Sequence, residues 1–311
     1  MADTLCFSMN NPYCIVNLFI SIEYLIKTIY INYRSINKKM KHTLIIIMLL
    51  LIAFGCNKET SKVATSEVVS IDTIFDNYYK FKDRINPIEA TKGGNNRYNN
   101  FIANYISDDY QKDLKANYSH FLNLLQEVDT TALSEADQLS MKVMQWDCEV
   151  KLEGLTNDIV TMASPMYNLP SFELMPLLQI QSLHLYVAQL AAGGSVQPFT
   201  TVEDYDNWLK RVDDYLRFLD TSMSKMKEGM AKNIVLPISL TQKIIPQLDE
   251  FISNSDKEHL FFKPILSMPE SIIEEDRQRI TADYSNMIAN KLKPKYTELK
   301  QFLVKEYLPV C

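Results

Sequence analysis

Apolar residues recur every three or four positions through most of the chain after residue 66, and this spacing predicts α-helices. The longest pattern begins after Pro198, where Thr200 or Thr201 can cap the helix. Glu203 and Asp204 fall in its first turn, near the positive end of the helix dipole. A single stripe about eight turns long follows. It consists of Val202, Tyr205, Trp208, Leu209, Val212, Tyr215, Leu216, Leu219, Met223, Met226 and Met230.

A second helix is predicted to start at Ser134, with Glu135 and Asp137 in its first turn. Its apolar positions are Leu139, Val143, Met144, Trp146, Val150 and Leu155. Further helices are predicted at 66–82, 111–127, 239–252, 271–291 and 294–307. Pro294 suits the first turn of the last one. Its buried face is predicted to consist of Tyr296, Leu299, Phe302, Leu303 and Tyr307.

Between the second and the longest helix the pattern is broken by Pro165, Pro170, Pro176, Gly193 and Gly194. We interpret this stretch as irregular loops around one short helix, 173–191. Residues 66–311 are therefore predicted to form an all-α domain, an irregular multi-helix array with Pro-rich loops.

The amino-acid composition disfavours two kinds of fold and one kind of binding partner. Only seven of the 311 residues are glycine, the residue that tight hairpins and phosphate-binding loops require, so a β-barrel or a Rossmann domain is disfavoured. The formal net charge is −6, and no stripe of lysine and arginine is apparent. Binding to nucleic acid is therefore not expected.

The N-terminal region contains a pattern typical of exported proteins. An unbroken apolar run from Leu44 to Phe54 follows Lys41 and His42. Its eleven residues are too few for a membrane-spanning helix, which needs about 20, but they suit the apolar part of a signal peptide. Residues 40–55 are therefore predicted to be a lipoprotein signal peptide.

The end of that run, Ala53-Phe54-Gly55-Cys56, resembles the lipobox of bacterial lipoproteins, in which the cysteine thiol carries diacylglycerol. Cys56 is the predicted lipid-attachment residue, and residues 56–65 are the predicted polar tether. The protein would then be anchored to a membrane of the cell envelope and face the periplasm or the exterior. The alternative is a free cysteine that ends a plain signal peptide or a short membrane anchor.

Residues 1–39 precede a complete signal peptide and need a separate explanation. They include a second apolar stretch, from Ile15 to Ile31, which Glu23 and Lys27 interrupt. The simplest interpretation is a start site assigned too early, with Met40 as the true initiator. The alternative is a first membrane helix, in which two charged residues would be costly.

The cysteines agree with this division. Cys6, Cys14 and Cys56 belong to the leader and its cleavage point, which leaves Cys148 and Cys311 in the body. No disulfide framework is implied. Five of the 32 basic and two of the 38 acidic residues precede Cys56, so the remainder has 27 basic and 36 acidic residues and a net charge of −9.

A search for catalytic patterns predicts no catalytic, cofactor-binding or metal-binding residue in this chain. His42, His120, His184 and His259 are far apart, and none belongs to an HExxH motif or to a Glu-x-x-His pair. His184 is interpreted as a hydrogen-bonded packing residue. The start of the 271–291 helix, Glu274 to Asp276, is interpreted as a solvated turn.

Two further features of the longest helix also receive structural interpretations. Asp213 and Asp214 point in different directions on a helix, so they do not form a paired-carboxylate site. The methionine stripe Met223, Met226 and Met230 is interpreted as core rather than as a binding groove.

An ordered series of motifs resembles the bacterial family called domain of unknown function 885, over about residues 66–309. The series comprises Leu183-His184-Leu185, Gln189-Leu190-Ala191, Gln197 to Arg211, Gly229-Met230, Val235-Leu236-Pro237, Ile245 to Leu248, Phe262 to Ile265, Met268-Pro269, Tyr296, Phe302-Leu303 and Glu306 to Pro309. The resemblance implies a mostly helical, exported protein, often a lipoprotein. It also implies a zinc-metallopeptidase-like second half with an HExxH-type motif. That motif has no counterpart in this sequence, so the resemblance transfers neither zinc ligands nor a catalytic residue.

The sequence therefore favours the N-terminal, non-catalytic half of a peptidase-like lipoprotein, from a truncated or frame-disrupted gene, whose substrate is unknown. One alternative is a helical lipoprotein that acts as a binding or scaffolding module. Another is that a separate chain supplies the missing C-terminal half. If later helices are missing, the 294–307 helix is expected to leave an apolar patch exposed and to promote self-association.

Overall fold

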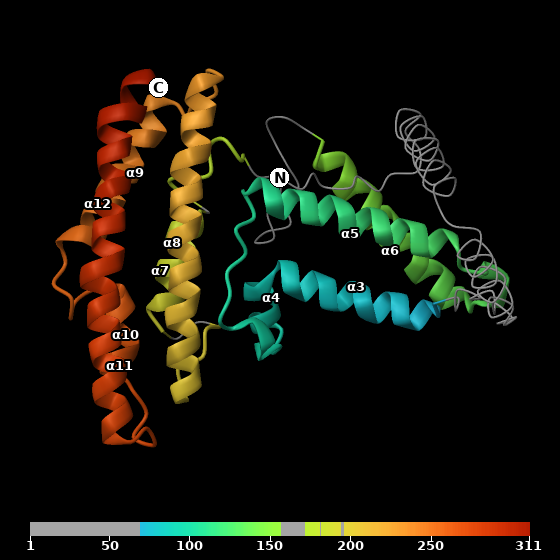
Figure 1. The fold of residues 1–311 in the computed structure, drawn as a ribbon, viewed down its shortest axis with the longest axis horizontal. Coiled ribbons are helices and arrows are strands. Elements are labelled where there is room, and N and C mark those ends of the chain that lie inside the picture. Colours follow the sequence, from blue (N-terminus) through green and yellow to red (C-terminus); the bar gives the residue numbers. More distant parts are fainter. Residues whose placement is uncertain (1–68, 157–171, 181, 194–195) are drawn as a thin grey trace, which may run out of the picture. The chain divides into compact units, whose positions relative to one another are not determined.

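The computed structural model describes residues 69–156, 172–180, 182–193 and 196–311. These residues form α-helices with short 3-10 and π-helical turns, and no strand occurs among them. The all-α prediction is confirmed (Figure 1). The predicted leader, signal peptide and tether, residues 1–65, lie outside the described residues, as do Pro165 and Pro170.

One group of helices packs around its own apolar core. It consists of α3 (Ile71–Ile85), α5 (Asp108–Gln126) and α6 (Glu135–Gly154), which lie side by side in Figure 1. Each begins after a serine whose side chain accepts a hydrogen bond from a backbone amide three residues later. The core comprises Ile74, Phe81, Ile85, Leu114, Tyr118, Phe121, Leu125, Met144, Cys148 and Leu155.

A larger core surrounds α8 (Val202–Ala231). The predicted cap is confirmed, because Thr201 and Asp204 form a reciprocal capping box at its start. Its neighbours include α7 (Leu183–Ala191), α9 (Ile238–Ser253) and the short α10 (Lys263–Leu266). The side chains of α8 in this core are those of Tyr205, Trp208, Val212, Tyr215, Phe218, Leu219, Met223 and Met226. Partly buried Met230 packs against them, which confirms the interpretation of the methionine stripe.

The C-terminal helix differs from the prediction of two helices that break before Pro294. Helix α11 (Glu274–Met287) continues through a π-helical turn (Ile288–Leu292) directly into α12 (Lys293–Phe302). Proline has no N–H and its ring crowds the preceding turn of a regular α-helix. The wider π-helical turn just before Pro294 gives the ring room, so the helix continues where the sequence suggested a boundary.

Helix α8 and this C-terminal helix run in the same direction, as the order of the contacts between them shows. Four ion pairs follow that order: Asp206–Arg279 at 2.8 Å, Asp213–Lys291 at 2.7 Å, Asp220–Lys295 at 2.6 Å and Lys227–Glu306 at 3.2 Å. Between them the buried hydroxyl groups of Tyr215 and Tyr296 lie 3.1 Å apart. Aromatic packing therefore forms the inside of the contact and ion pairs form its border.

Two expectations about individual elements require correction, and one short helix was not predicted. The predicted buried face of the last helix is confirmed, since Tyr296, Leu299, Phe302, Leu303 and Tyr307 are all buried. The apolar patch expected along this helix is therefore wrong, because α8 and α9 cover that face. Among the described residues of the helix predicted at 173–191, helix is confined to 183–191, since Pro176 lies in the preceding non-helical segment. The six-residue α4 (Pro87–Lys92) was not predicted.

Candidate functional site

The predicted lipid-attachment residue, Cys56, lies outside the described residues, so its attachment stays a prediction. Within the part of the chain that the structure describes, no helix combines the length and apolarity needed to cross a bilayer.

His184 is a packing histidine, as predicted. Its side chain is fully buried, and both ring nitrogens have partners: Nδ1 lies 2.9 Å from Ser182 Oγ and Nε2 lies 3.1 Å from Gln247 Oε1. Burial lowers the pKa of His184 to about 4, against the opposing effect of the Gln247 hydrogen bond. The imidazole is therefore neutral at pH 7 and is held between α7 and α9.

The other described histidines lie in different surroundings. His259 is buried, and its Nδ1 accepts a hydrogen bond from the amide of Phe261 at 3.3 Å. Burial, and then the charge of Lys293, lower the pKa of His259 to about 4. His120 is exposed on α5 beside the ring of Phe121. Among the described residues, no group of three or more His, Cys, Asp or Glu side chains is arranged to hold a metal ion.

The two neighbouring aspartates of α8 diverge, as predicted. Asp213 pairs with Lys291 on the C-terminal helix. Buried Asp214 instead accepts a hydrogen bond from the amide of Ile102 at 3.0 Å and pairs with Arg217. The two carboxylates therefore stabilise two different contacts rather than a shared site.

A polar cluster crosses the core between α3 and α6. Tyr78 donates a hydrogen bond to Asp147, and Lys82 donates another to the same carboxylate oxygen at 3.0 Å. The adjacent Cys148 is fully buried. Burial raises the pKa of the Cys148 thiol to about 11, although its contact with Tyr78 opposes this. The thiol is therefore protonated at pH 7, and this position does not provide a reactive nucleophile.

The most connected polar side chain of the described region is Arg211, which the search for sequence motifs did not identify. It is fully buried in α8. Its guanidinium donates to the carbonyls of Pro87, Tyr98 and Phe101, to Thr91 Oγ1 and to Gln197 Oε1. Burial lowers the pKa of Arg211 to about 10, so it stays charged at pH 7. Arg211 thereby fixes the segment 87–101, which contains the short α4, to α8.

An open polar cleft of about 310 Å³ lies where α5 begins beside α8. Its charged centre is Lys225, whose ammonium group lies 2.5 Å from Asp108, 3.4 Å from Glu228 and 3.9 Å from Glu173. Burial lowers the pKa of Lys225, but the hydrogen bond that Lys225 donates to Asp108 and the charges of the carboxylates outweigh burial and raise the pKa. Asp108 is the first residue of α5, so its ion pair with Lys225 joins the start of α5 to α8.

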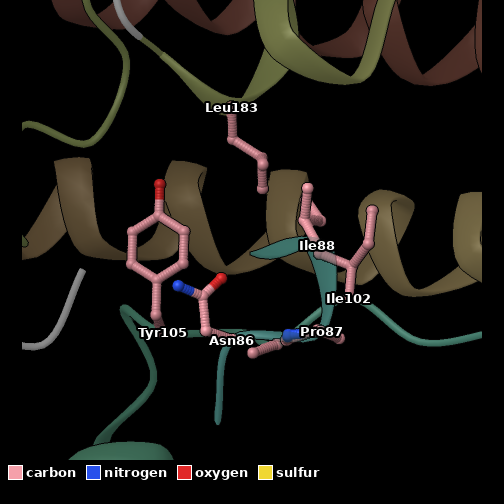
Figure 2. A pocket seen from close by; sticks show the side chains of 7 residues that line it. Asn86, Pro87, Ile88, Ile102, Tyr105 and Leu183 are labelled. Atoms are coloured by element: carbon pink, nitrogen blue, oxygen red, sulfur yellow. The ribbon is translucent and has the colours of Figure 1, made fainter. Parts of the chain in front are cut away.

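A much smaller cavity, of about 10 Å³, lies between α7 and the segment that Arg211 holds. Figure 2 shows Leu183 directed toward the space between the side chains of Tyr105 and Ile88. The lining residues are Asn86, Pro87, Ile88, Ile102, Ala103, Tyr105 and Leu183. Such a volume has room for about one water molecule, so it is a packing gap rather than a ligand pocket.

Known proteins resemble this chain in fold and in sequence. The fold is similar to the crystal structure of "the putative lipoprotein from Colwellia psychrerythraea", with a TM-score of 0.60 and 17% sequence identity. The match covers 74% of this chain but only 39% of that protein. No curated protein matches. The family model for a bacterial protein of unknown function, DUF885, matches residues 87–311. The chain therefore belongs to the DUF885 family.

Proposed function

We propose that this protein is a membrane-tethered helical module of the cell envelope, anchored through Cys56 and without catalytic groups of its own. The observation that carries the tether is the short apolar run from Leu44 to Phe54, which ends at Cys56 and is followed by a polar segment. The description of the Colwellia protein as a lipoprotein supports the same anchor for a similar fold.

The surroundings of the histidines support the non-catalytic part of the proposal. The imidazole of His184 uses both nitrogens in structural hydrogen bonds, and His259 Nδ1 accepts one from a backbone amide. A catalytic zinc usually requires three protein ligands and a bound water. Because both buried histidines have structural roles, this region is more consistent with a scaffold than with a hydrolase.

A change at Cys56 tests the tether. The Cys56→Ala protein should lose both incorporation of radioactive fatty acid and partitioning into detergent, because the acyl chains supply about 0.8 kcal/mol for each buried methylene. The matched control is Cys311→Ala, which should keep both. Unchanged labelling of the Cys56→Ala protein would overturn the tether.

Metal analysis tests the absence of catalytic groups. The purified full chain is expected to contain well under one zinc per molecule and to leave a peptide library uncleaved. A stoichiometric zinc that disappears in a His184→Gln or His259→Gln protein would contradict the proposal, provided that circular dichroism shows the variant to be folded.

A second candidate function is a substrate-binding wall within a peptidase-like assembly. The observation that favours it is that this chain spans 39% of the length of the structurally similar Colwellia protein. Its helices would then form one side of a cleft that other helices complete. Zinc-dependent peptide cleavage that appears only when the chain is mixed with the remaining portion of a longer family member would support this function over the scaffold.

A further inference from the structure

The outer face of α6 is apolar and exposed, opposite the face that enters the core. Leu139 is 64% exposed, Val143 57% and Trp146 63%. On the other side of the same helix, Met144, Cys148 and Leu155 are buried. The sequence pattern placed five of these six residues, all except Cys148, in one apolar set, whereas the structure divides them between two faces. A helix with two apolar faces is typical of one that packs on both sides.

The spacing on the outer face indicates what kind of element it fits. Ala136, Leu139, Val143, Trp146 and Val150 follow one another at intervals of three, four, three and four residues. We call these five residues the outer stripe. Alternation of three and four is the a/d pattern through which two α-helices pack side by side. Among the described residues, no helix covers the three large side chains of the stripe, which leaves them open to a helix of another molecule.

Charges on one edge of the outer stripe favour a second copy of this chain. Lys142 and Glu149 are both exposed and lie one heptad apart beside the stripe. In an antiparallel pair centred between Val143 and Trp146, Lys142 of each copy faces Glu149 of the other, so two reciprocal ion pairs form. A parallel pair would instead place Lys142 opposite Asp147, whose charge is already paired with Lys82 within its own chain, whereas Glu149 accepts a hydrogen bond from the neutral amide of Gln145.

We propose that α6 is a self-association surface on which a second copy of this chain docks its own α6 in antiparallel orientation. The proposal does not depend on the tether. The stripe covers only about four helical turns, so the interface is small and the dimer dissociates readily. Trp146 is its anchor, since a central tryptophan contributes most of the binding energy in small interfaces.

Charge reversal tests the orientation. Sedimentation velocity of the purified full chain in mild detergent should show a monomer–dimer equilibrium. Lys142→Glu and Glu149→Lys should each weaken the dimer about tenfold or more, since each places two pairs of like charges at the interface. The double variant Lys142→Glu/Glu149→Lys should restore wild-type affinity. Lys115→Glu, an exposed reversal on α5, is the matched control and should have no effect.

Cross-linking tests the same geometry without detergent. When two differently tagged full-length copies are expressed together, Lys142→Cys in one copy and Glu149→Cys in the other should form a disulfide under mild oxidation. Two copies that both carry Lys142→Cys should not. A wild-type chain that stays monomeric at all concentrations, or single charge reversals without effect, would overturn the proposal. So would vesicle binding that needs Trp146 in a strictly monomeric protein, because the stripe would then be a membrane surface.

Discussion

At the scale of single residues, buried polar side chains fix the irregular parts of this fold. Arg211 is the clearest case, because its donors meet five acceptors, four in the segment 87–101 and one on Gln197. A buried hydrogen-bonded charge contributes little net stability compared with an apolar residue of the same shape. Removing it while its acceptors stay buried is costly, because each acceptor loses its partner.

The Arg211→Met protein should therefore lose about 3 kcal/mol or more of its free energy of unfolding. Urea denaturation followed by circular dichroism measures the change. Lys210→Met is the control, because Lys210 is the neighbouring exposed residue of α8 and its replacement should change stability by less than about 0.5 kcal/mol. Equal effects of the two replacements would mean that the segment 87–101 is held by other contacts.

The low pKa of buried His184 predicts that the folded chain loses stability in acid. Its pKa is about 4 in the folded chain against 6.5 when unfolded, so the unfolded chain binds a proton that the folded chain does not. Neutral His184 makes its full contribution to the free energy of unfolding above pH 6.5. This contribution declines as the pH falls toward 4, and the total loss is about 3 kcal/mol. Unfolding free energies measured between pH 7 and pH 4 should show this decline. A His184→Gln protein with the same decline would contradict this assignment.

These two residues differ in how far the sequence could predict them. His184 lies between apolar neighbours in a helix pattern, so a packing role followed from its immediate surroundings. The acceptors of Arg211 lie more than 100 residues earlier, except for Gln197, in a segment without a regular pattern. Nothing in the local sequence of α8 separates Arg211 from a solvated arginine such as Arg217.

At the scale of elements, the pairing of α8 with the C-terminal helix organises the larger core. Tyr215 and Tyr296 meet inside it, while the four ion pairs lie along the border with partly exposed side chains. Exposed ion pairs contribute about 0 to 1 kcal/mol each and weaken in salt. Aromatic burial therefore accounts for most of the stability of this pairing, and the ion pairs mainly favour its parallel alignment.

The combined replacement Asp206→Asn, Asp213→Asn and Asp220→Asn should accordingly cost only about 1–2 kcal/mol at low ionic strength. The difference from wild type should shrink in 1 M salt, because the Debye length falls to about 3 Å. Thermal unfolding at two salt concentrations measures it. A large loss that persists in high salt would show that these carboxylates have a structural role beyond ion pairing.

Periodicity predicted the long helices well, because burial of one face repeats the same spacing over many turns. Periodicity was a weaker predictor where a single residue determines the local structure. The π-helical turn before Pro294 depends on packing that the sequence does not reveal, and α4 is too short to show a period. Four residues of the outer stripe of α6 were grouped with Met144 and Leu155 in one apolar set for the same reason, since spacing shows which positions are apolar but not what covers them.

At the scale of the whole molecule, different parts of the sequence form the helical body and the proposed anchor. The body is built from helices around two apolar cores. The anchor depends on a short segment that ends at Cys56. If the account is right, the body is held at a membrane surface and presents the outer stripe of α6 for association with a second copy.

Mass spectrometry of the N-terminal peptide, from protein isolated from membranes of the native bacterium, tests the tether most directly. The account predicts a chain that begins at Cys56, with a mass increased by a diacylglycerol group on that residue. An N-terminus at any other residue, or a Cys56 thiol without lipid, would contradict it.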